Sequence, residues 1–427
     1  MAPSRADRSI NRWAQLALMV ACTVMLSNMQ YGWTLFVNPM QKENHWERAG
    51  IQLAFSIMIL LNTWLAPIEG MLVDRYGPRL VVMFGGLCAA AAWALNSYAQ
   101  SLASLYVGAV VGGVGMGCVF GTCMGTALKW FPDRRGLATG LIAMGYGLGA
   151  AASVIPLASM IQSSGYRRAF LVFGLIQGLS IFAMGMFLVK PLRKIGASAR
   201  TAAAQVDIHP SKTFRTAVFW MIYLVYVMIG FGGMVITAQL GPLALDFGVE
   251  KQIVTILRLS MPVLTLAASV DNFANGITRP LCGLLSDKIG RENAMLLVFS
   301  AEGLAFAGMI VFGRRPLAFV LFAALIFLFW GEIFSVFPAI CGDTFGVRHA
   351  AANNGLLYTA KGASSLAVPL ANLLVSVTGT WTSVLLAACV CSIGAGFMAK
   401  FVVAPMRQRL ASRYAPQQPQ AVPAPIL

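Results

Sequence analysis

The decapeptide GMLVDRYGPR, Gly70 to Arg79, recurs as GLLSDKIGRE, Gly283 to Glu292. Each copy lies at the end of a long apolar segment. The first glycine lets two helices approach closely, the aspartate can accept hydrogen bonds from an adjacent helix N-terminus or an arginine, and the basic residues hold a tight turn. We predict that both copies are clasps between helices, at Gly70, Asp74, Arg75, Gly77, Arg79, Gly283, Asp287, Lys288, Gly290 and Arg291.

The composition around these motifs is that of a membrane protein. Of the 427 residues, 58% are hydrophobic and 11% are charged, and the mean hydropathy is +0.74. Soluble domains carry about 25% charged residues, and a membrane-spanning helix needs about 20 mainly apolar residues. We therefore expect an all-α membrane protein with twelve transmembrane helices at residues 13–37, 50–73, 79–98, 102–128, 137–163, 168–189, 217–240, 257–285, 293–313, 316–340, 350–377 and 380–404.

Lys and Arg residues predict the orientation, because they accumulate in cytoplasmic loops. With a cytoplasmic N-terminus, 21 of the 31 lie inside, 8 lie outside and 2 lie within the membrane. Both termini are therefore expected in the cytoplasm, in a bacterial-type inner membrane. The same count accounts for the net charge of +16, so nucleic acid is not an expected partner.

The repeated motif and a central polar segment divide the chain into two halves. The copies lie at the ends of the second and eighth predicted spans, so the repeat covers six helices. We expect two pseudo-symmetric six-helix bundles, a cytoplasmic linker and a cytoplasmic tail that is Pro-, Gln- and Ala-rich and disordered. The predicted boundaries are 1–189 for the first bundle, 190–216 for the linker, 217–404 for the second bundle and 405–427 for the tail.

Two full positive charges fall inside the predicted spans. They are Arg279 and Lys361. An ionised side chain in mid-membrane costs roughly 2.5–3.5 kcal/mol even on lenient insertion scales, so such residues usually face a bundle interior. Arg offers a planar fork that can hold a carboxylate, and Lys a compact charge for its other end. We interpret the pair as an anion path; the alternative is that both neutralise acids in the membrane.

Acids in the same spans keep that alternative open. Glu332 follows Trp330 by two residues, and Asp271 precedes Arg279 by eight. Either acid could balance the positive charge or carry a proton. Asn275 lies four residues before Arg279, on the same helix face, where it could bond to the arginine or to a ligand.

Other chemistry is not expected. The eight cysteines lie almost entirely in apolar segments, and His45, His209 and His349 are far apart in sequence, so no metal site is assigned. The glycine-rich segments lack the strand and the Lys-Ser/Thr of a phosphate-binding loop. No nucleophile motif is present. We expect neither an enzyme nor a cofactor.

Twelve spans, a central linker and two copies of G-x-L-x-D-[RK]-x-G-x-R resemble the major facilitator superfamily across the whole chain. Five segments are more closely similar to the oxalate/formate antiporter family, which is related to monocarboxylate transporters. They are NMQYGWTLFVNP (28–39), KWFPDRRGLATG (129–140), AMGYGLGA (143–150), NGITRPLCGLLSDKIGR (275–291) and the segment around Lys361. The resemblance implies alternating access around a site at the bilayer midplane.

The resemblance also implies roles for single residues. Arg279 and Lys361 match the family's two carboxylate-binding cations. Gln30, Tyr31 and Trp330 match polar and aromatic residues of its substrate cavity. Two family tyrosines fall on Phe120 and Phe334, which implies a less polar substrate cage.

Three functions remain open from the sequence. The first is a secondary transporter that exchanges small carboxylates, as oxalate for formate. The second is a proton-coupled monocarboxylate symporter of the lactate or pyruvate type, with Glu332 or Asp271 as proton carrier. The third is a sensor that binds the anion without transporting it. A monomer in a lipid bilayer, with protons as a further partner in the second case, is the expectation from the superfamily.

Overall fold

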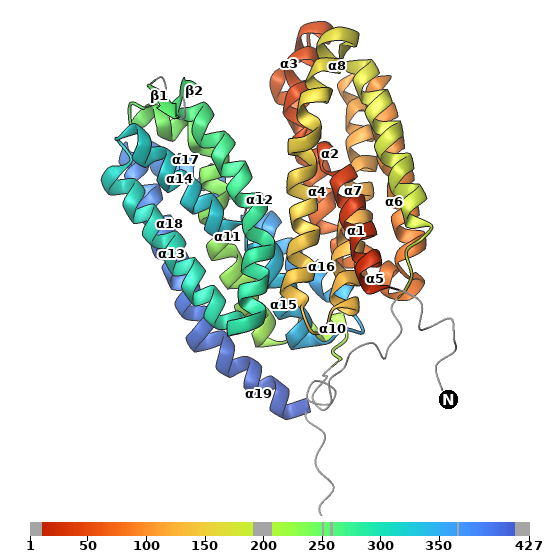
Figure 1. The fold of residues 1–427 in the computed structure, drawn as a ribbon, viewed down its shortest axis with the longest axis vertical. Coiled ribbons are helices and arrows are strands. Elements are labelled where there is room, and N and C mark those ends of the chain that lie inside the picture. Colours follow the sequence, from red (N-terminus) through yellow and green to blue (C-terminus); the bar gives the residue numbers. More distant parts are fainter. Residues whose placement is uncertain (1–10, 191–206, 250–251, 257–258, 365–366, 415–427) are drawn as a thin grey trace, which may run out of the picture.

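A computed structural model describes residues 11–190, 207–249, 252–256, 259–364 and 367–414. The described chain is almost entirely helical, and its helices stand in two bundles (Figure 1). A helix satisfies its own backbone hydrogen bonds, which a lipid environment requires. The expected all-α class is confirmed, apart from one small hairpin.

The N-terminal bundle contains the helices up to Gly185. The two expected spans 137–163 and 168–189 both lie within α8, which is interrupted at Gly165, where φ is 81°. Glycine adopts this left-handed conformation without steric cost. The helices are α1 (Arg12–Leu26), α2 (Asn28–Tyr31), α3 (Trp33–Asn44), α4 (Arg48–Trp64), α5 (Ala66–Tyr76), α6 (Pro78–Ser97), α7 (Leu102–Trp130) and α8 (Arg135–Gly185).

The C-terminal bundle follows a short helix, α10, that precedes its first span. A π-helical turn, Ala399–Val403, joins its last two helices. The elements are α10 (Pro210–Thr213), α11 (Ala217–Asp246), β1 (Ile253–Ile256), β2 (Leu259–Pro262), α12 (Val263–Ile289), α13 (Arg291–Phe312), α14 (Pro316–Trp330), α15 (Ile333–Phe345), α16 (Ala350–Ser364), α17 (Ala367–Thr378), α18 (Trp381–Met398) and α19 (Ala404–Tyr414).

Several expected spans are interrupted helices. Seven described helices are individually long and apolar enough to cross a membrane, or eight if the bent pair α4 and α5 is one span. The first expected span is divided into α1, α2 and α3, and the tenth into α14 and α15. Such breaks shorten the continuous apolar helix, and the chain bends by 48° between α4 and α5.

Two boundaries differ from expectation. Residues 257–262 were expected to begin a helix, but Leu259–Pro262 pairs antiparallel with Ile253–Ile256, and the helix begins at Val263. Residues 405–414 were expected to be disordered, but they belong to α19. Met406 and Leu410, one turn apart, pack against the core and thereby stabilise α19. Residues 191–206 of the expected linker and 415–427 of the tail lie outside the described residues.

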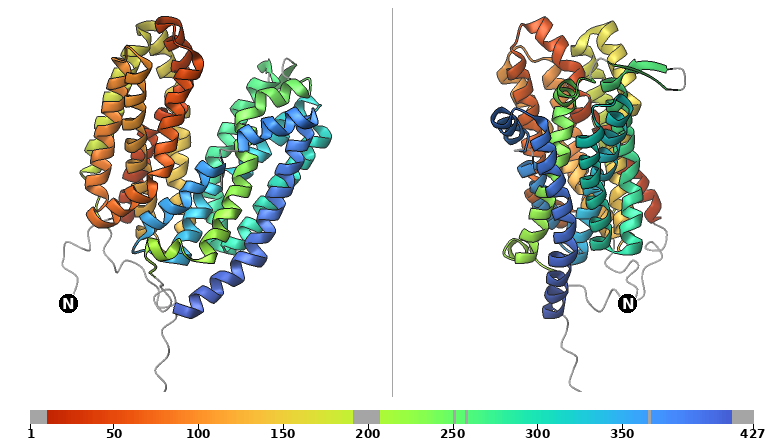
Figure 2. Two further views of the ribbon diagram at one scale, coloured as in Figure 1. Left: turned by 180° about the vertical axis from the view of Figure 1, so that it is seen from behind. Right: turned by 90° about the vertical axis from the view of Figure 1, so that its left-hand side faces the viewer.

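The two bundles meet at the end that carries both motifs, which we call the motif end. In Figures 1 and 2 they lie side by side there and diverge toward the opposite end. The motif turns contain Gly77 and Gly290, with φ values of 87° and 90°. Arg79 and Lys288 are exposed beside these turns, and Arg75 lies over the Tyr76 ring.

Each motif aspartate caps a helix of the opposite bundle. Asp287 accepts hydrogen bonds from the backbone N–H groups of Gly136 and Leu137, at the start of α8, at 3.0 Å each. Asp74 accepts from the N–H of Ala352, near the start of α16, at 3.2 Å. A carboxylate at a helix N-terminus satisfies unpaired N–H groups and complements the helix dipole. Each motif aspartate therefore joins the two bundles at the motif end.

Basic residues complete the clasp. Lys129 pairs with Asp74, and Arg291 pairs with Asp287. Asp343 of α15 bridges the bundles, because it pairs with Arg135 of α8 and with Arg291 of its own bundle.

Glycine brings the two backbones together at the motif end. A Cβ atom built on Gly283 would lie 2.1 Å from the carbonyl oxygen of Gly136, and one on Gly70 would lie 2.4 Å from that of Ala351. Since real Cβ atoms do not approach so closely, any larger residue would force the bundles apart.

The clasp generates a prediction for Asp287→Asn. The neutral amide loses two charge-assisted hydrogen bonds, each worth about 1.5–3 kcal/mol, so separation at the motif end should become more than tenfold more favourable. Double electron–electron resonance between spin labels at Arg79→Cys and Lys288→Cys, in a background without the native cysteines, should show longer distances.

Asp133→Asn is the matched control. Asp133 lies at the same end but pairs with Arg12 and Arg134 of its own bundle. An unchanged distance distribution in Asp287→Asn, or an equal change in Asp133→Asn, would contradict the role assigned to the clasp.

Candidate functional site

Arg279 lies in α12 with 2% of its surface exposed. Its Nη1 donates to the carbonyl oxygen of Ala143, in α8 of the other bundle, at 2.5 Å. Its Nη2 donates to Oδ1 of Asn275 at 2.6 Å, the bond that the four-residue spacing predicts. The buried Nε has no partner among the described residues. Two neutral acceptors therefore orient the guanidinium, and its Nε–H can still donate to a further acceptor.

Asn275 is itself fixed by the fold. Its Nδ2 donates to the carbonyl oxygen of Phe327, in α14, at 3.2 Å. This bond orients the amide so that its oxygen faces the arginine. Asn275 thus contributes to positioning Arg279.

Lys361 lies in α16 and is 6% exposed. Its Nζ donates to the hydroxyl of Tyr358 at 3.1 Å. An ammonium group has three donors, and neither Lys361 nor Arg279 forms an ion pair with any acid in the described chain. The two cations are buried without a counter-charge.

Phe334 holds the two cations near one another. The guanidinium carbon of Arg279 lies 4.5 Å from its ring centroid, and Nζ of Lys361 lies 5.4 Å from it. The two groups therefore cannot be more than about 10 Å apart. At an effective dielectric constant of about 20, two like charges at that distance repel by about 2 kcal/mol. The ring face offsets part of this repulsion, and an anion between the cations would remove it.

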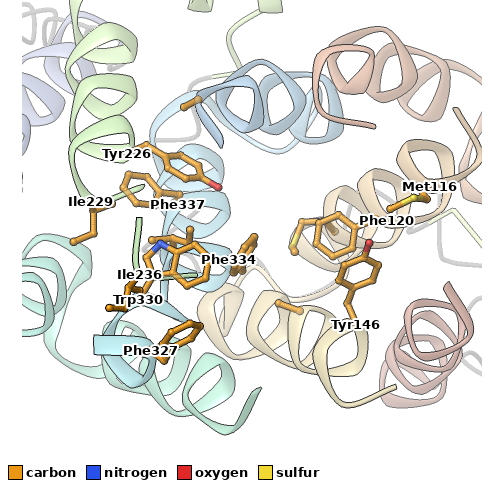
Figure 3. Close-up of a cluster of buried hydrophobic side chains, with 14 of the residues drawn as sticks. Met116, Phe120, Tyr146, Tyr226, Ile229, Ile236, Phe327, Trp330, Phe334 and Phe337 are labelled. Atoms are coloured by element: carbon orange, nitrogen blue, oxygen red, sulfur yellow. The ribbon is translucent and has the colours of Figure 1, made fainter. Parts of the chain in front are cut away.

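An aromatic wall from both bundles surrounds the cations. Tyr146 lies 5.5 Å from Tyr31 and 5.1 Å from Phe120, measured between ring centroids. In Figure 3, Phe334 lies between this group and Trp330, whose ring is 5.9 Å from it. Gln30 joins the wall by accepting a hydrogen bond from the Tyr146 hydroxyl at 2.9 Å. The structure thus brings together the cavity residues of helices distant in sequence.

Two tyrosines of this wall, Tyr146 and Tyr358, were not predicted from the sequence. Tyr146 and Tyr358 both contact Phe120, at 5.1 and 5.8 Å. They supply hydroxyl groups near the positions where Phe120 and Phe334 lack them. Two features of the sequence point to these residues: Tyr146 interrupts a run of small residues, and Tyr358 precedes Lys361 by one helical turn. Neither feature predicts that both tyrosines contact Phe120.

The membrane acids do not pair with the cations. Glu332 and Glu302 are fully buried, Asp271 is 1% exposed, and the carboxyl oxygens of all three lack hydrogen-bond partners in the described residues. The suggested ion pair of Glu332 with Arg279 or Lys361 is absent here. These acids form a feature separate from the cation pair.

Metal-binding residues do not converge on this site. Within the described ranges, no three His, Cys, Asp or Glu side chains form a group that could hold a metal. His209 and His349, although distant in sequence, do meet, with ring centroids 5.1 Å apart. This pair lies in polar segments near the motif end.

Comparison with known proteins places the chain among transporters. A family model of the Major Facilitator Superfamily matches residues 17–369. The oxalate:formate antiporter of Oxalobacter formigenes is 32% identical over 394 residues, 92% of each chain. Monocarboxylate transporter 11 of Mus musculus is 31% identical over 210 residues, 48% of this chain and 46% of the relative.

Solved structures agree on the fold. The Escherichia coli fucose:proton symporter FucP superposes with a TM-score of 0.70 at 12% identity, over 92% of this chain and 99% of that one. The proton:xylose symporter XylE superposes with a TM-score of 0.67 at 12% identity, over 92% and 96%.

The family model covers most of the chain, the similarity to the antiporter extends over nearly the whole of both proteins, and the two-bundle fold is shared. The protein belongs to the major facilitator superfamily, in the oxalate/formate antiporter family related to monocarboxylate transporters.

Proposed function

We propose that this protein is a secondary active transporter of small carboxylate anions, and that it exchanges one carboxylate for another by alternating access. One observation carries the proposal. Arg279 and Lys361 are buried beside the ring of Phe334, within about 10 Å of each other, and no described acid pairs with either. Because the described residues leave this charge unbalanced, a bound anion would neutralise the pair.

The chemistry of the two groups favours a carboxylate. Arg279 keeps Nε free beside two occupied donors, and a carboxylate can exchange with the Ala143 carbonyl for the Nη1 donor. Charge-assisted bonds to a carboxylate are stronger than bonds to a neutral carbonyl. The Lys361 ammonium can take the other oxygen of a monocarboxylate or the second group of a dicarboxylate. The aromatic wall limits the ligand to a small or flat acid.

The asymmetry of the two ends supports the proposal of alternating access. The bundles are clasped at the motif end and diverge at the other, and the Arg279–Ala143 bond crosses between them. A carboxylate that takes this donor weakens one contact between the bundles. Binding would thereby favour release of the clasp and opening toward the motif end.

We assign the motif end to the cytoplasm. The Lys and Arg distribution supports this orientation, with both termini inside. The relative from Oxalobacter formigenes supports a bacterial inner membrane. The conformation described here is then outward-facing.

Proton-coupled uptake is the second candidate, favoured by the acids. A buried carboxyl group without a partner is unfavourable as an anion and is suited to carrying a proton. Glu332 and Asp271 meet that description. Monocarboxylate transporters are among the relatives. Coupling would let the protein accumulate an acid without a counter-substrate.

The cation assignment predicts the effect of Arg279→Gln and of Lys361→Gln. Each variant loses a charge-assisted bond worth about 1.5–3 kcal/mol, so uptake should fall by more than tenfold. The measurement is entry of radiolabelled oxalate into liposomes preloaded with formate, with reconstituted protein quantified in each sample. Arg314→Gln, an exposed residue at the opposite end from the motifs, is the matched control. Normal uptake in either site variant would refute the anion site.

The hydrogen bond to Lys361 predicts the effect of Tyr358→Phe. Loss of the hydroxyl leaves the ammonium with greater rotational freedom and one donor unpaired, worth about 1–3 kcal/mol, so KM should rise about fivefold or more while the protein still folds. Tyr106→Phe is the control, since Tyr106 is fourteen residues before Phe120 in α7 and thus about 21 Å away. An unchanged KM in Tyr358→Phe would remove this hydroxyl from the site.

The two candidate functions differ in what drives uptake. We expect accumulation only in vesicles preloaded with a carboxylate, because exchange needs a counter-substrate. Uptake into empty vesicles that requires an inward proton gradient, and that Glu332→Gln or Asp271→Asn abolishes, would instead establish proton coupling. Exchange of external for internal carboxylate in preloaded vesicles should persist in both variants.

A further inference from the structure

A cavity lies at the motif end of the C-terminal bundle, away from the cation pair. Its volume is about 510 Å³. It lies between the start of α11 and the surface of α19, which extends beyond the bundle in Figure 1. Its lining comprises Arg215, Thr216, Ala217, Val218, Met406, Arg409, Leu410 and Arg413.

The cavity lining carries three positive charges and no acid. In the described part of the chain, the guanidinium groups of Arg215, Arg409 and Arg413 form no ion pair and no hydrogen bond. Arg409 and Arg413 are four residues apart, so they share one face of α19. Arg407, on another face of the same helix, is bonded to Thr344 and paired with Glu292. The fold thus neutralises one arginine of α19 and leaves the two that face the cavity without partners.

The cavity lies at the level of the membrane surface. The segment Trp381–Val403, α18 with its π-helical turn, has 23 residues and is about 35 Å long. This exceeds the hydrocarbon thickness of about 30 Å, so α19 begins where the lipid head groups lie. On the side of the cavity opposite α19, the apolar span of α11 begins at Ala217.

Apolar and aromatic groups accompany the charges. Met406 and Leu410 contribute to the lining, and the exposed rings of Phe214 and Trp220 lie beside it in sequence, with the indole N–H bonded to the Phe214 carbonyl at 2.9 Å. Tryptophan is enriched at this depth because its ring is amphipathic. A ligand with a charged head and an apolar body matches both parts of the lining.

We propose that this cavity binds the phosphate group of an anionic phospholipid, with Arg215, Arg409 and Arg413 as its ligands. Arginine forks bind phosphate oxygens in bidentate fashion. A head group with net negative charge fits three arginines without an acid, whereas the ammonium group of a zwitterionic lipid would face repulsion. This site is independent of the proposed carboxylate site.

The test is native mass spectrometry of the full-length protein in detergent, with dioleoyl phosphatidylglycerol titrated against dioleoyl phosphatidylcholine. A basic residue near an anionic lipid contributes about fivefold in binding, so Arg409→Gln with Arg413→Gln should weaken phosphatidylglycerol binding about 25-fold. Arg314→Gln with Arg315→Gln removes the same charge at the opposite end and should leave binding unchanged. Arg407 is retained in both, so the anchor of α19 is preserved.

Three results would overturn the proposal. They are equal binding of the two lipids, equal loss in the control variant, and displacement of phosphatidylglycerol by millimolar inorganic phosphate, which would identify a site for free phosphate. Selective phosphatidylglycerol binding that phosphate does not displace, and that only the Arg409/Arg413 variant loses, would support it.

Discussion

Two like charges buried in a low-dielectric interior are the constraint around which this protein is arranged. Arg279 and Lys361 repel each other and have no acid partner in the described chain, so the fold can hold them only by other means. Neutral acceptors take the guanidinium donors, a phenol takes one ammonium donor, and the face of Phe334 lies against both cations. These groups lower the cost of the charges without neutralising them. In the proposed function, the remaining deficit is what makes an incoming anion favourable.

One of these charges also joins the two bundles. Arg279 belongs to one bundle and bonds to a carbonyl of the other, so a ligand that competes for the guanidinium acts on a contact between them. Toward the motif end, the contacts become ionic and are duplicated, with Asp74 and Asp287 each capping a helix of the opposite bundle. Near the cation pair, the contact between the bundles is a hydrogen bond to a neutral carbonyl, and at the motif end the contacts involve carboxylates. The glycines at the interface allow the backbones to approach closely enough for these caps to form.

Charged side chains elsewhere in the described residues differ in whether they have a partner. Arg407 pairs with Glu292, while Arg409 and Arg413 on the same helix line a basic cavity. Glu302 and Glu332 are buried without any partner in the described residues. Such groups are costly to hold. Among the described residues, the molecule therefore combines charges that are balanced internally with charges that have no partner in the fold.

The sequence by itself determined the class of fold and the principal charges of the site. Apolar runs, the repeated motif and two intramembrane cations are local properties, and their cost in lipid does not depend on details of packing. Asn275 was predictable for the same reason, since four residues define one helix face. The helix breaks, the hairpin before α12 and the helical α19 were not, because short apolar contacts decide them.

Only the tertiary structure decided which residues share a space. Tyr146 and Tyr358 come from different bundles and both contact Phe120, and Glu332, two residues from Trp330, does not pair with the cations. The meeting of Arg215 with Arg409 and Arg413 spans almost two hundred residues. Sequence spacing sets direction along one helix, but contacts between helices depend on how the bundles pack, and that is a property of the whole chain.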